Sequence, residues 1–327
     1  MERKSDLDHL RIAAAFAVVL FHVLGSAVHN DPTVSTDLQL SAARWKAMLG
    51  WPVPVFFMIT GFLQLHPKRE CTYRKVWGSL RRFGLVLFTV GFAYALMERV
   101  FVAGTLSARL LLLALGDVFS GRLWDHMWYL YAAIGVYLAL PVIRPFFDTQ
   151  APGSIRLATA LLWLFTVLAP ALEDACGYVL PVKLPLAEPL FYVFAGGALA
   201  RLHIPRRTGW LAGAGFVLCC LLLYGNALGA LSPLLTSLAA LLIFVFFAGA
   251  LAGRPSTTAV RSMAECTFGV YLFQQFFINV MIKVLHIYPL RFAPVPGVVL
   301  SALCVFVLSF LAALLLRRIR WVRNRLL

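Results

Sequence analysis

Two ionisable residues near the start of the chain share one face of a predicted helix. Arg11 and His22 are eleven residues apart, close to three complete turns, so both project in the same direction along roughly 16 Å of helix. The intervening residues, Ile12 to Phe21, are all apolar. An imidazole that follows ten apolar residues is expected to be buried, either as a hydrogen-bonded core residue or as a reactive group. The arginine on the same helix face favours a reactive group.

These two side chains have complementary chemistry. A neutral imidazole can take a proton from a hydroxyl or carry an acyl group itself. A guanidinium at the membrane edge suits an anionic cofactor, because it binds phosphate through two parallel hydrogen bonds. Arg81 and Arg82, at the predicted start of the third span, have two interpretations: phosphate contacts, or ordinary basic residues flanking a membrane helix.

The composition indicates the elements that must hold such a site. Of the 327 residues, 61% are hydrophobic and only 13% are charged, whereas soluble proteins have about 45–50% and about 25%. The six cysteines have neither a metal-binding spacing nor a disulfide pattern. The net charge of +15 is concentrated next to apolar segments, which favours membrane lipids as partners and argues against nucleic acid. We therefore expect an all-α polytopic membrane protein, forming a single domain over residues 1–327.

Ten segments are long and apolar enough to be predicted as spans of about 20 residues each. They are Leu10 to Val28, Met48 to Leu65, Phe83 to Phe101, His126 to Phe146, Ile155 to Leu172, Ala187 to His203, Gly209 to Tyr224, Leu231 to Leu251, Phe268 to His286 and Val295 to Leu316. The stretch Leu106 to Phe119 is too short and too polar to span, and is expected to be an interfacial or re-entrant helix after the third span.

The distribution of basic residues predicts the orientation. With ten spans and a cytosolic N-terminus, 21 of the 29 Lys and Arg residues fall on the cytosolic side and eight on the other. Positive residues accumulate on the cytosolic side of membrane proteins. We therefore expect both termini in the cytosol and Arg11 at the cytosolic edge of the first span.

Several segments, in order, resemble the membrane-bound acyltransferase 3 family, most closely its enterobacterial common antigen O-acetyltransferase branch. The resemblance extends over most of the chain. It is carried by the spacing of Arg11 and His22, by Val53-Pro-Val-Phe-Phe-Met-Ile-Thr-Gly-Phe62, by the basic start of the third helix, by His126-Met-Trp-Tyr-Leu130, by Phe191 to Gly197 and by Phe268-Gly-Val-Tyr-Leu272.

The resemblance implies a bacterial inner-membrane enzyme that moves an acetyl or similar group from cytosolic acyl-CoA to a hydroxyl of a periplasmic or lipid-linked glycan. It implies acetyl-CoA as the donor co-substrate. The residue pattern itself predicts no metal site. By position, His22 matches the catalytic histidine, and Arg11 its partner in the acyl-CoA tunnel. Arg82, with Arg81, matches the basic start of the third helix. His126 and Trp128 match an outer segment that would hold the acceptor sugar.

The chain departs from the family pattern at two places. Thr60 precedes Gly61 where the family often has serine, and this change keeps the hydroxyl. In the ninth span the family commonly has a histidine shortly after Tyr-Leu, and this chain has Gln274 and Gln275 there instead. Glutamine forms hydrogen bonds but carries no proton at physiological pH. We expect Thr60, Gln274 and Gln275 to contribute at most to substrate positioning, with helix-to-helix hydrogen bonding as the alternative for the glutamines.

Two other functions fit the same residues. In a transporter or flippase, Arg11 and His22 would form a solute or proton path, and solute would move without consumption of acyl-CoA. A succinyltransferase would use the same residues with a larger donor, because the spacing carries no information on pocket size.

Overall fold

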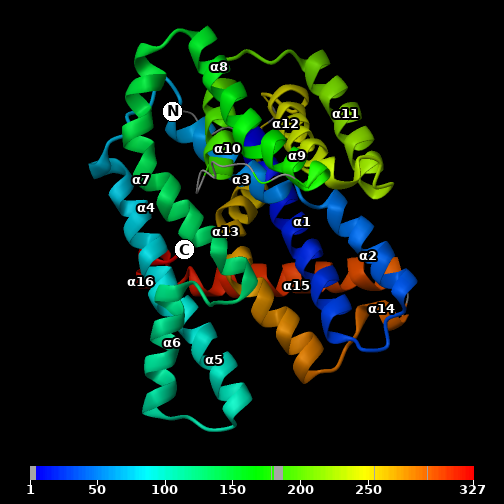
Figure 1. Ribbon diagram of the computed structural model, residues 1–327. Coiled ribbons are helices and arrows are strands. Elements are labelled where there is room, and N and C mark those ends of the chain that lie inside the picture. Colours follow the sequence, from blue (N-terminus) through cyan, green and yellow to red (C-terminus); the bar gives the residue numbers. More distant parts are fainter. Residues whose placement is uncertain (1–4, 178, 180–186, 254, 293) are drawn as a thin grey trace.

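The computed structural model describes residues 5–177, 179, 187–253, 255–292 and 294–327. Within these residues the chain is helical and contains no strand (Figure 1). Nine helical segments of the described part are long and apolar enough to cross a membrane: Asp6–Asn30, Thr36–Gln64, Tyr73–Ala103, Asp125–Thr149, Pro152–Cys176, Arg206–Tyr224, Gly229–Ala250, Thr258–Val284 and Pro294–Leu316. The prediction of an all-α polytopic membrane protein is confirmed.

The first helix, α1 (Ser5–Asn30), lies at the centre of the bundle and packs on two sides (Figure 1). Leu7, Leu10 and Ala14 join one buried apolar cluster, whereas Val19 and Val23 join another. Since both flanks of α1 are covered, the half-buried side chains on its remaining face can open only into spaces between helices.

The second predicted span, Met48 to Leu65, is divided in the structure. It consists of the end of α2 (Thr36–Met48) and all of α3 (Pro52–Gln64), separated by a break at residues 49–51. Pro52 is the first residue of α3; it has no backbone N–H to donate to the preceding turn, so a helix can begin at this residue more easily than it can continue through it. The break sets the direction of α2 independently of α3.

The third helix begins ten residues earlier than Phe83, the predicted start. It consists of α4 (Tyr73–Val86), a π-helical turn over Leu87–Gly91 and α5 (Phe92–Ala103). The early residues are polar because this end of the helix is largely exposed, and a hydropathy criterion therefore leaves them out. As a consequence, Arg81 and Arg82 lie in the third turn of α4 rather than at its start.

The segment after the third span forms α6 (Ala108–Ser120), close to the expected range of Leu106 to Phe119. It is too short to cross a bilayer at about 1.5 Å per residue. Figure 1 shows α5 and α6 as a helical hairpin that extends beyond the rest of the bundle. Arg99 on α5 donates to Asp117 on α6 at 2.8 Å, which joins the two arms of this hairpin.

The remaining helices complete the bundle. They are α7 (Trp128–Thr149), preceded by a 3-10 turn over Asp125–Met127; α8 (Pro152–Trp163) and α9 (Ala169–Cys176), joined by a π-helical turn over Leu164–Leu168; α10 (Ala187–Leu199); α11 (Arg206–Tyr224); α12 (Ser232–Ala250); α13 (Thr258–Asn279), extended by a π-helical turn over Val280–Val284; α14 (Pro289–Phe292); α15 (Pro294–Leu316); and α16 (Arg320–Arg325). A 3-10 turn over Gly229–Leu231 precedes α12.

The sixth predicted span, Ala187 to His203, is shorter in the structure. Its helix, α10, ends at Leu199 and measures about 20 Å over 13 residues, less than the roughly 30 Å of a bilayer core. The seven residues from 180 to 186 lie outside the described part of the chain. Arg201, just past the helix, donates to the carbonyls of Leu65 and Phe147 at 2.7 and 3.0 Å, so it anchors the end of α10 to α3 and α7.

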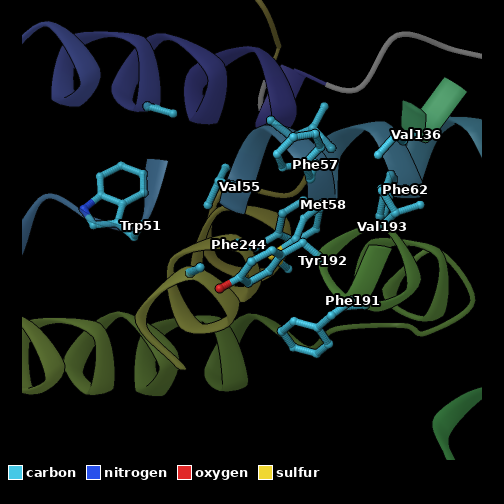
Figure 2. Close-up of a cluster of buried hydrophobic side chains, with 14 of the residues drawn as sticks. Trp51, Val55, Phe57, Met58, Phe62, Val136, Phe191, Tyr192, Val193 and Phe244 are labelled. Atoms are coloured by element: carbon cyan, nitrogen blue, oxygen red, sulfur yellow. The ribbon is translucent and has the colours of Figure 1, made fainter. Parts of the chain in front are cut away.

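α10 and α3 pack backbone against backbone through two glycines. A Cβ atom at Gly61 would lie 1.9 Å from the Val193 carbonyl oxygen, and one at Gly196 would lie 2.0 Å from that of Met58. Figure 2 shows the apolar cluster around this crossing, with side chains from α3, α10 and α12: Phe57, Met58, Phe62, Phe191, Tyr192, Val193 and Phe244. This contact holds α10 within the bundle despite its short length.

Candidate active site

Two histidines from distant parts of the chain meet inside the bundle. His22 comes from the C-terminal half of α1, and His126 comes from the 3-10 turn before α7. Their ring centroids lie 6.2 Å apart, with the planes inclined at 74°. A hydroxyl or carbonyl group of a substrate can therefore reach both rings at once.

His126 is enclosed by aromatic side chains. It is 2% exposed, and the rings of Tyr94, Trp124 and Tyr271 lie 6.1, 6.4 and 5.4 Å from its own. The carbonyl of Leu272 faces the ring, but neither ring nitrogen makes a hydrogen bond of normal distance and angle to a described residue. Buried polar atoms without partners are rare in folded proteins and call for an explanation.

Arg11, His22 and His126 line one small cavity of about 140 Å³, which we call the Arg11 cavity. Its other walls are mainly apolar and aromatic, including Phe56 and Tyr129. The side chain of Arg11 is 28% exposed and lies 3.4 Å from the carboxylate of Asp8. The eleven-residue spacing along α1 thus places a guanidinium and an imidazole on the wall of a common space.

A second, much larger space of about 1060 Å³ lies on another side of His22. We call it the charged cavity, because its walls include Lys46, Glu98, Arg99, Asp117, Arg122, Asp125 and Lys283. Some of these charges are paired: Lys283 lies 3.5 Å from Glu98, which also accepts a hydrogen bond from the Trp124 indole at 3.2 Å. Trp124 stacks on Tyr94 at 4.2 Å, so its indole is held in place at the wall.

A third space of about 330 Å³, the apolar cavity, lies between α1, α3, α10 and α12. Its lining includes Val18, Phe57 and Tyr192. Among the described residues, Glu188 contributes a carboxylate to this lining. His22 and Trp128 border all three cavities. The imidazole of His22 is therefore accessible to molecules that arrive from three directions.

The other predicted site residues are more dispersed. Gln275 lines the charged cavity, whereas Gln274 is fully buried, with neither amide atom hydrogen-bonded to a described residue. The Thr60 hydroxyl donates to the carbonyl of Phe56 within α3 at 3.0 Å, and Thr60 borders none of the three cavities.

Arg81 and Arg82 also lie away from these spaces. Arg81 is exposed, Arg82 is half-buried, and neither borders any of the three cavities. The structure therefore places four of the predicted site residues on cavities that His22 also borders: Arg11, His126, Trp128 and Gln275. It leaves the two arginines of α4 apart from them.

Lys46 is a neighbour of His22 that the sequence reasoning missed. Its ammonium lies 4.7 Å from the ring of Phe21, the residue before His22, and forms part of the wall of the charged cavity. In the sequence, Lys46 is one of several charges before an apolar run, and the packing of α2 against α1 places its ammonium beside Gly25. A single lysine between Trp45 and Met48 is the weak signal that was available.

Among the described residues, no group of three or more His, Cys, Asp or Glu side chains is arranged to hold a metal ion. The ionisable groups closest to His22 include the imidazole of His126 and the ammonium of Lys46, and the guanidinium of Arg11 lines one of its cavities.

Comparison with known proteins identifies one family. The sequence model of the family described as "Acyltransferase domain" (Acyl_transf_3) matches residues 4–318, nearly the whole chain. Searches of curated proteins and of solved structures give no significant match.

Proposed function

The chain belongs to the acyltransferase 3 family and is a membrane acyltransferase, and from this premise we propose that it acylates a hydroxyl of a cell-surface or periplasmic glycan. The proposed donor is a cytosolic acyl-CoA, with acetyl-CoA as the first candidate. The proposed location is the bacterial inner membrane. We propose α10 as a tenth crossing segment beside the nine long helices, since an even number of crossings places both termini in the cytosol, where the ten-span topology puts most Lys and Arg residues.

The position of His22 is the observation that carries the proposal. It borders both the Arg11 cavity and the charged cavity. A donor entering beside Arg11 and an acceptor entering through the charged cavity would meet at one imidazole. Holding two reactants in such a geometry can supply several kcal/mol of the barrier reduction, roughly 7–11 in the best intramolecular cases.

In the proposed mechanism, His22 removes the proton of the acceptor hydroxyl as its oxygen attacks the thioester carbonyl. A neutral imidazole suits this step near neutral pH. Arg11 binds the anionic part of the donor, since a guanidinium pairs with phosphate through two hydrogen bonds. Arg81 and Arg82, further away on α4, would then contact the donor only at the entrance.

The charged cavity has the features that a sugar site requires. Trp124 and Trp128 provide aromatic faces on which a sugar ring can stack, and Gln275 and Asp125 provide hydrogen-bonding groups. Its volume of about 1060 Å³ admits more than a single monosaccharide. These properties support a glycan or lipid-linked sugar as the acceptor.

The test uses purified protein in lipid vesicles with radiolabelled acetyl-CoA and lipid-linked sugars. Replacing His22 with alanine is expected to lower acetyl transfer by about 10²-fold or more, the usual contribution of a general base. His203→Ala is the matched control, because His203 is an exposed histidine outside the three cavities. Unimpaired transfer by His22→Ala would contradict the mechanism.

The same vesicles separate the alternatives. Solute movement without release of CoA would favour a transporter or flippase. Faster turnover of succinyl-CoA than of acetyl-CoA would identify succinyl-CoA as the preferred donor. A protein-bound acetyl group that forms on His22 before the acceptor is added would replace the base mechanism with an acyl relay.

A further inference from the structure

His126 borders the Arg11 cavity but not the charged cavity, whereas His22 borders both. We propose that His126 is a catalytic residue on the donor side, whose ring N–H donates a hydrogen bond to the carbonyl oxygen of the bound thioester. This assignment rests on the proposed acyl transfer. It moves His126 from the acceptor site, where the resemblance would put it, to the opposite side of His22.

The ring of His126 is a buried polar group, and the carbonyl of Leu272 that faces it already accepts a hydrogen bond from the Tyr94 hydroxyl. The His126 side chain is 2% exposed, and neither ring nitrogen makes a hydrogen bond of normal geometry to a described residue. Burying a polar group in this way costs free energy unless a ligand completes the hydrogen bond. The Arg11 cavity is the space that this ring borders, so a ligand in that cavity would supply the missing partner.

Aromatic rings enclose the His126 ring. They belong to Tyr94, Trp124, Tyr271 and His22, and none of them is anionic. The carboxylate of the preceding residue, Asp125, lines the charged cavity, which His126 does not border. A cationic ring would be costly in these surroundings at membrane depth, so the imidazole remains neutral and carries one N–H. A neutral imidazole can still polarise a carbonyl group and stabilise the negative charge that develops on its oxygen.

Hydrogen bonds from two tyrosines hold His126 and the backbone beside it in place. The Tyr271 hydroxyl donates to the backbone carbonyl of His126 at 2.7 Å. The Tyr94 hydroxyl donates to the carbonyl of Leu272 at 2.8 Å, so the backbone next to the ring is also fixed. Donors that are already in place before reaction stabilise a developing charge without the cost of rearrangement.

The two histidines have different roles in the reaction. The proton of the acceptor hydroxyl passes to His22 as the hydroxyl oxygen forms a bond to the thioester carbon. In the same step the carbonyl π electrons move onto the carbonyl oxygen, which accepts the hydrogen bond from His126. When these electrons return, the carbon–sulfur bond breaks, and the CoA thiolate takes the proton from His22. The products are the acylated acceptor and free CoA, and His126 keeps its own proton throughout.

The experiment measures CoA release in vesicles with and without acceptor, so that hydrolysis by water and transfer to sugar are followed separately. His126→Phe keeps an aromatic ring in the enclosure but removes the N–H. It is expected to lower kcat for both reactions by about 10²-fold, the typical effect of losing one such donor, and to leave the acceptor KM unchanged. His126→Gln, which retains an N–H donor, is expected to recover part of this rate.

Two further measurements complete the experiment. His203→Gln is the matched control and should behave as the wild type. Thermal unfolding in detergent shows whether each variant is folded. Tyr271→Phe, which removes the hydroxyl that holds the His126 backbone, is an independent variant and should lower kcat for CoA release in the same direction.

Each alternative result has a distinct meaning. A His126→Phe variant that raises the acceptor KM but releases CoA at the normal rate would place His126 with the acceptor and overturn the assignment. A His126→Gln variant no faster than His126→Phe would also overturn it. If the wild-type protein itself releases no CoA from any acyl-CoA, the proposed function fails first, and this assignment fails with it.

Discussion

Arg291 donates two hydrogen bonds to the carboxylate of Asp31, at 2.8 and 2.7 Å, across 260 positions of the chain. The same carboxylate accepts hydrogen bonds from the Thr33 backbone and hydroxyl at 3.0 and 2.7 Å. Asp31 directly follows α1, and Arg291 belongs to α14. This ion pair therefore anchors the end of the helix that carries His22.

The first prediction concerns the pH dependence of this anchor. The hydrogen bonds from Arg291 hold the pKa of Asp31 well below its usual range. A carboxylate with a lowered folded-state pKa stabilises the protein fully above its unfolded pKa of about 4, and this contribution is lost as the pH falls towards the folded-state value. Asp31→Asn is therefore expected to lower the thermal midpoint at pH 7, with a smaller difference from the wild type at pH 3.

Thermal unfolding in detergent at the two pH values is the measurement. Asp37→Asn is the control, because Asp37 is an exposed carboxylate in the first turn of α2, close by in the sequence. It should leave the midpoint unchanged at both pH values. An equal loss for Asp31→Asn at pH 7 and pH 3 would show that the ion pair is not the cause.

The second prediction concerns the crossing of α3 and α10. At Gly61, an added methyl group would lie 1.9 Å from the Val193 carbonyl oxygen, and a backbone atom cannot move aside as a side chain can. Gly61→Ala is therefore expected to destabilise the protein by about 3 kcal/mol or more, the upper range for overpacking. Thermal unfolding and the monodisperse fraction in size-exclusion chromatography measure this loss.

Gly78→Ala is the matched control for that substitution. Gly78 lies within α4, and nothing lies within 4 Å of the position of an added Cβ. Alanine has the higher helix propensity, so this change should be neutral or stabilising by up to about 1 kcal/mol. A similar loss of stability for both variants would contradict the close packing of α3 and α10.

The third prediction concerns donor binding and compares arginines. Arg11 borders the cavity with His22, whereas Arg81 lies outside the three cavities. Arg11→Gln is expected to raise the KM for acyl-CoA by about tenfold or more, the loss of one charge-assisted hydrogen bond. Arg81→Gln should raise it less, and Arg156→Gln, at an exposed position on α8, should not change it. Steady-state kinetics of CoA release at varied acyl-CoA provide the comparison.

An equal rise in KM for all three variants would indicate a general effect of positive charge on this side of the membrane. That result would contradict a specific role of Arg11. Repeating the measurement at high salt separates the two effects, because salt screens distant charges much more than a direct contact.

The part of the site on α1 could be predicted from the sequence because it depends on local geometry. Helical periodicity alone places Arg11 and His22 on one face, and an apolar run of span length makes the helix certain to form in a membrane. The contact of His22 with His126 depended on tertiary packing, and only the resemblance to a family drew attention to His126.

Other features lay beyond the reach of periodicity and hydropathy. The early start of α4 was missed because polar residues extend a helix past the membrane, and this start displaces Arg81 and Arg82 from the predicted position. Lys46 faces the site because α2 packs against α1, and the partner of Asp31, Arg291, lies 260 positions away in the chain. Such relationships arise from packing between elements.

The imidazole of His22 and the indole of Trp128 form part of the wall of all three cavities. A compound bound in any one of them would displace or fix the same two side chains that border the other two. Blockers of quite different chemical character, resembling a nucleotide thioester, a sugar or a fatty chain, would therefore exclude one another without occupying the same volume.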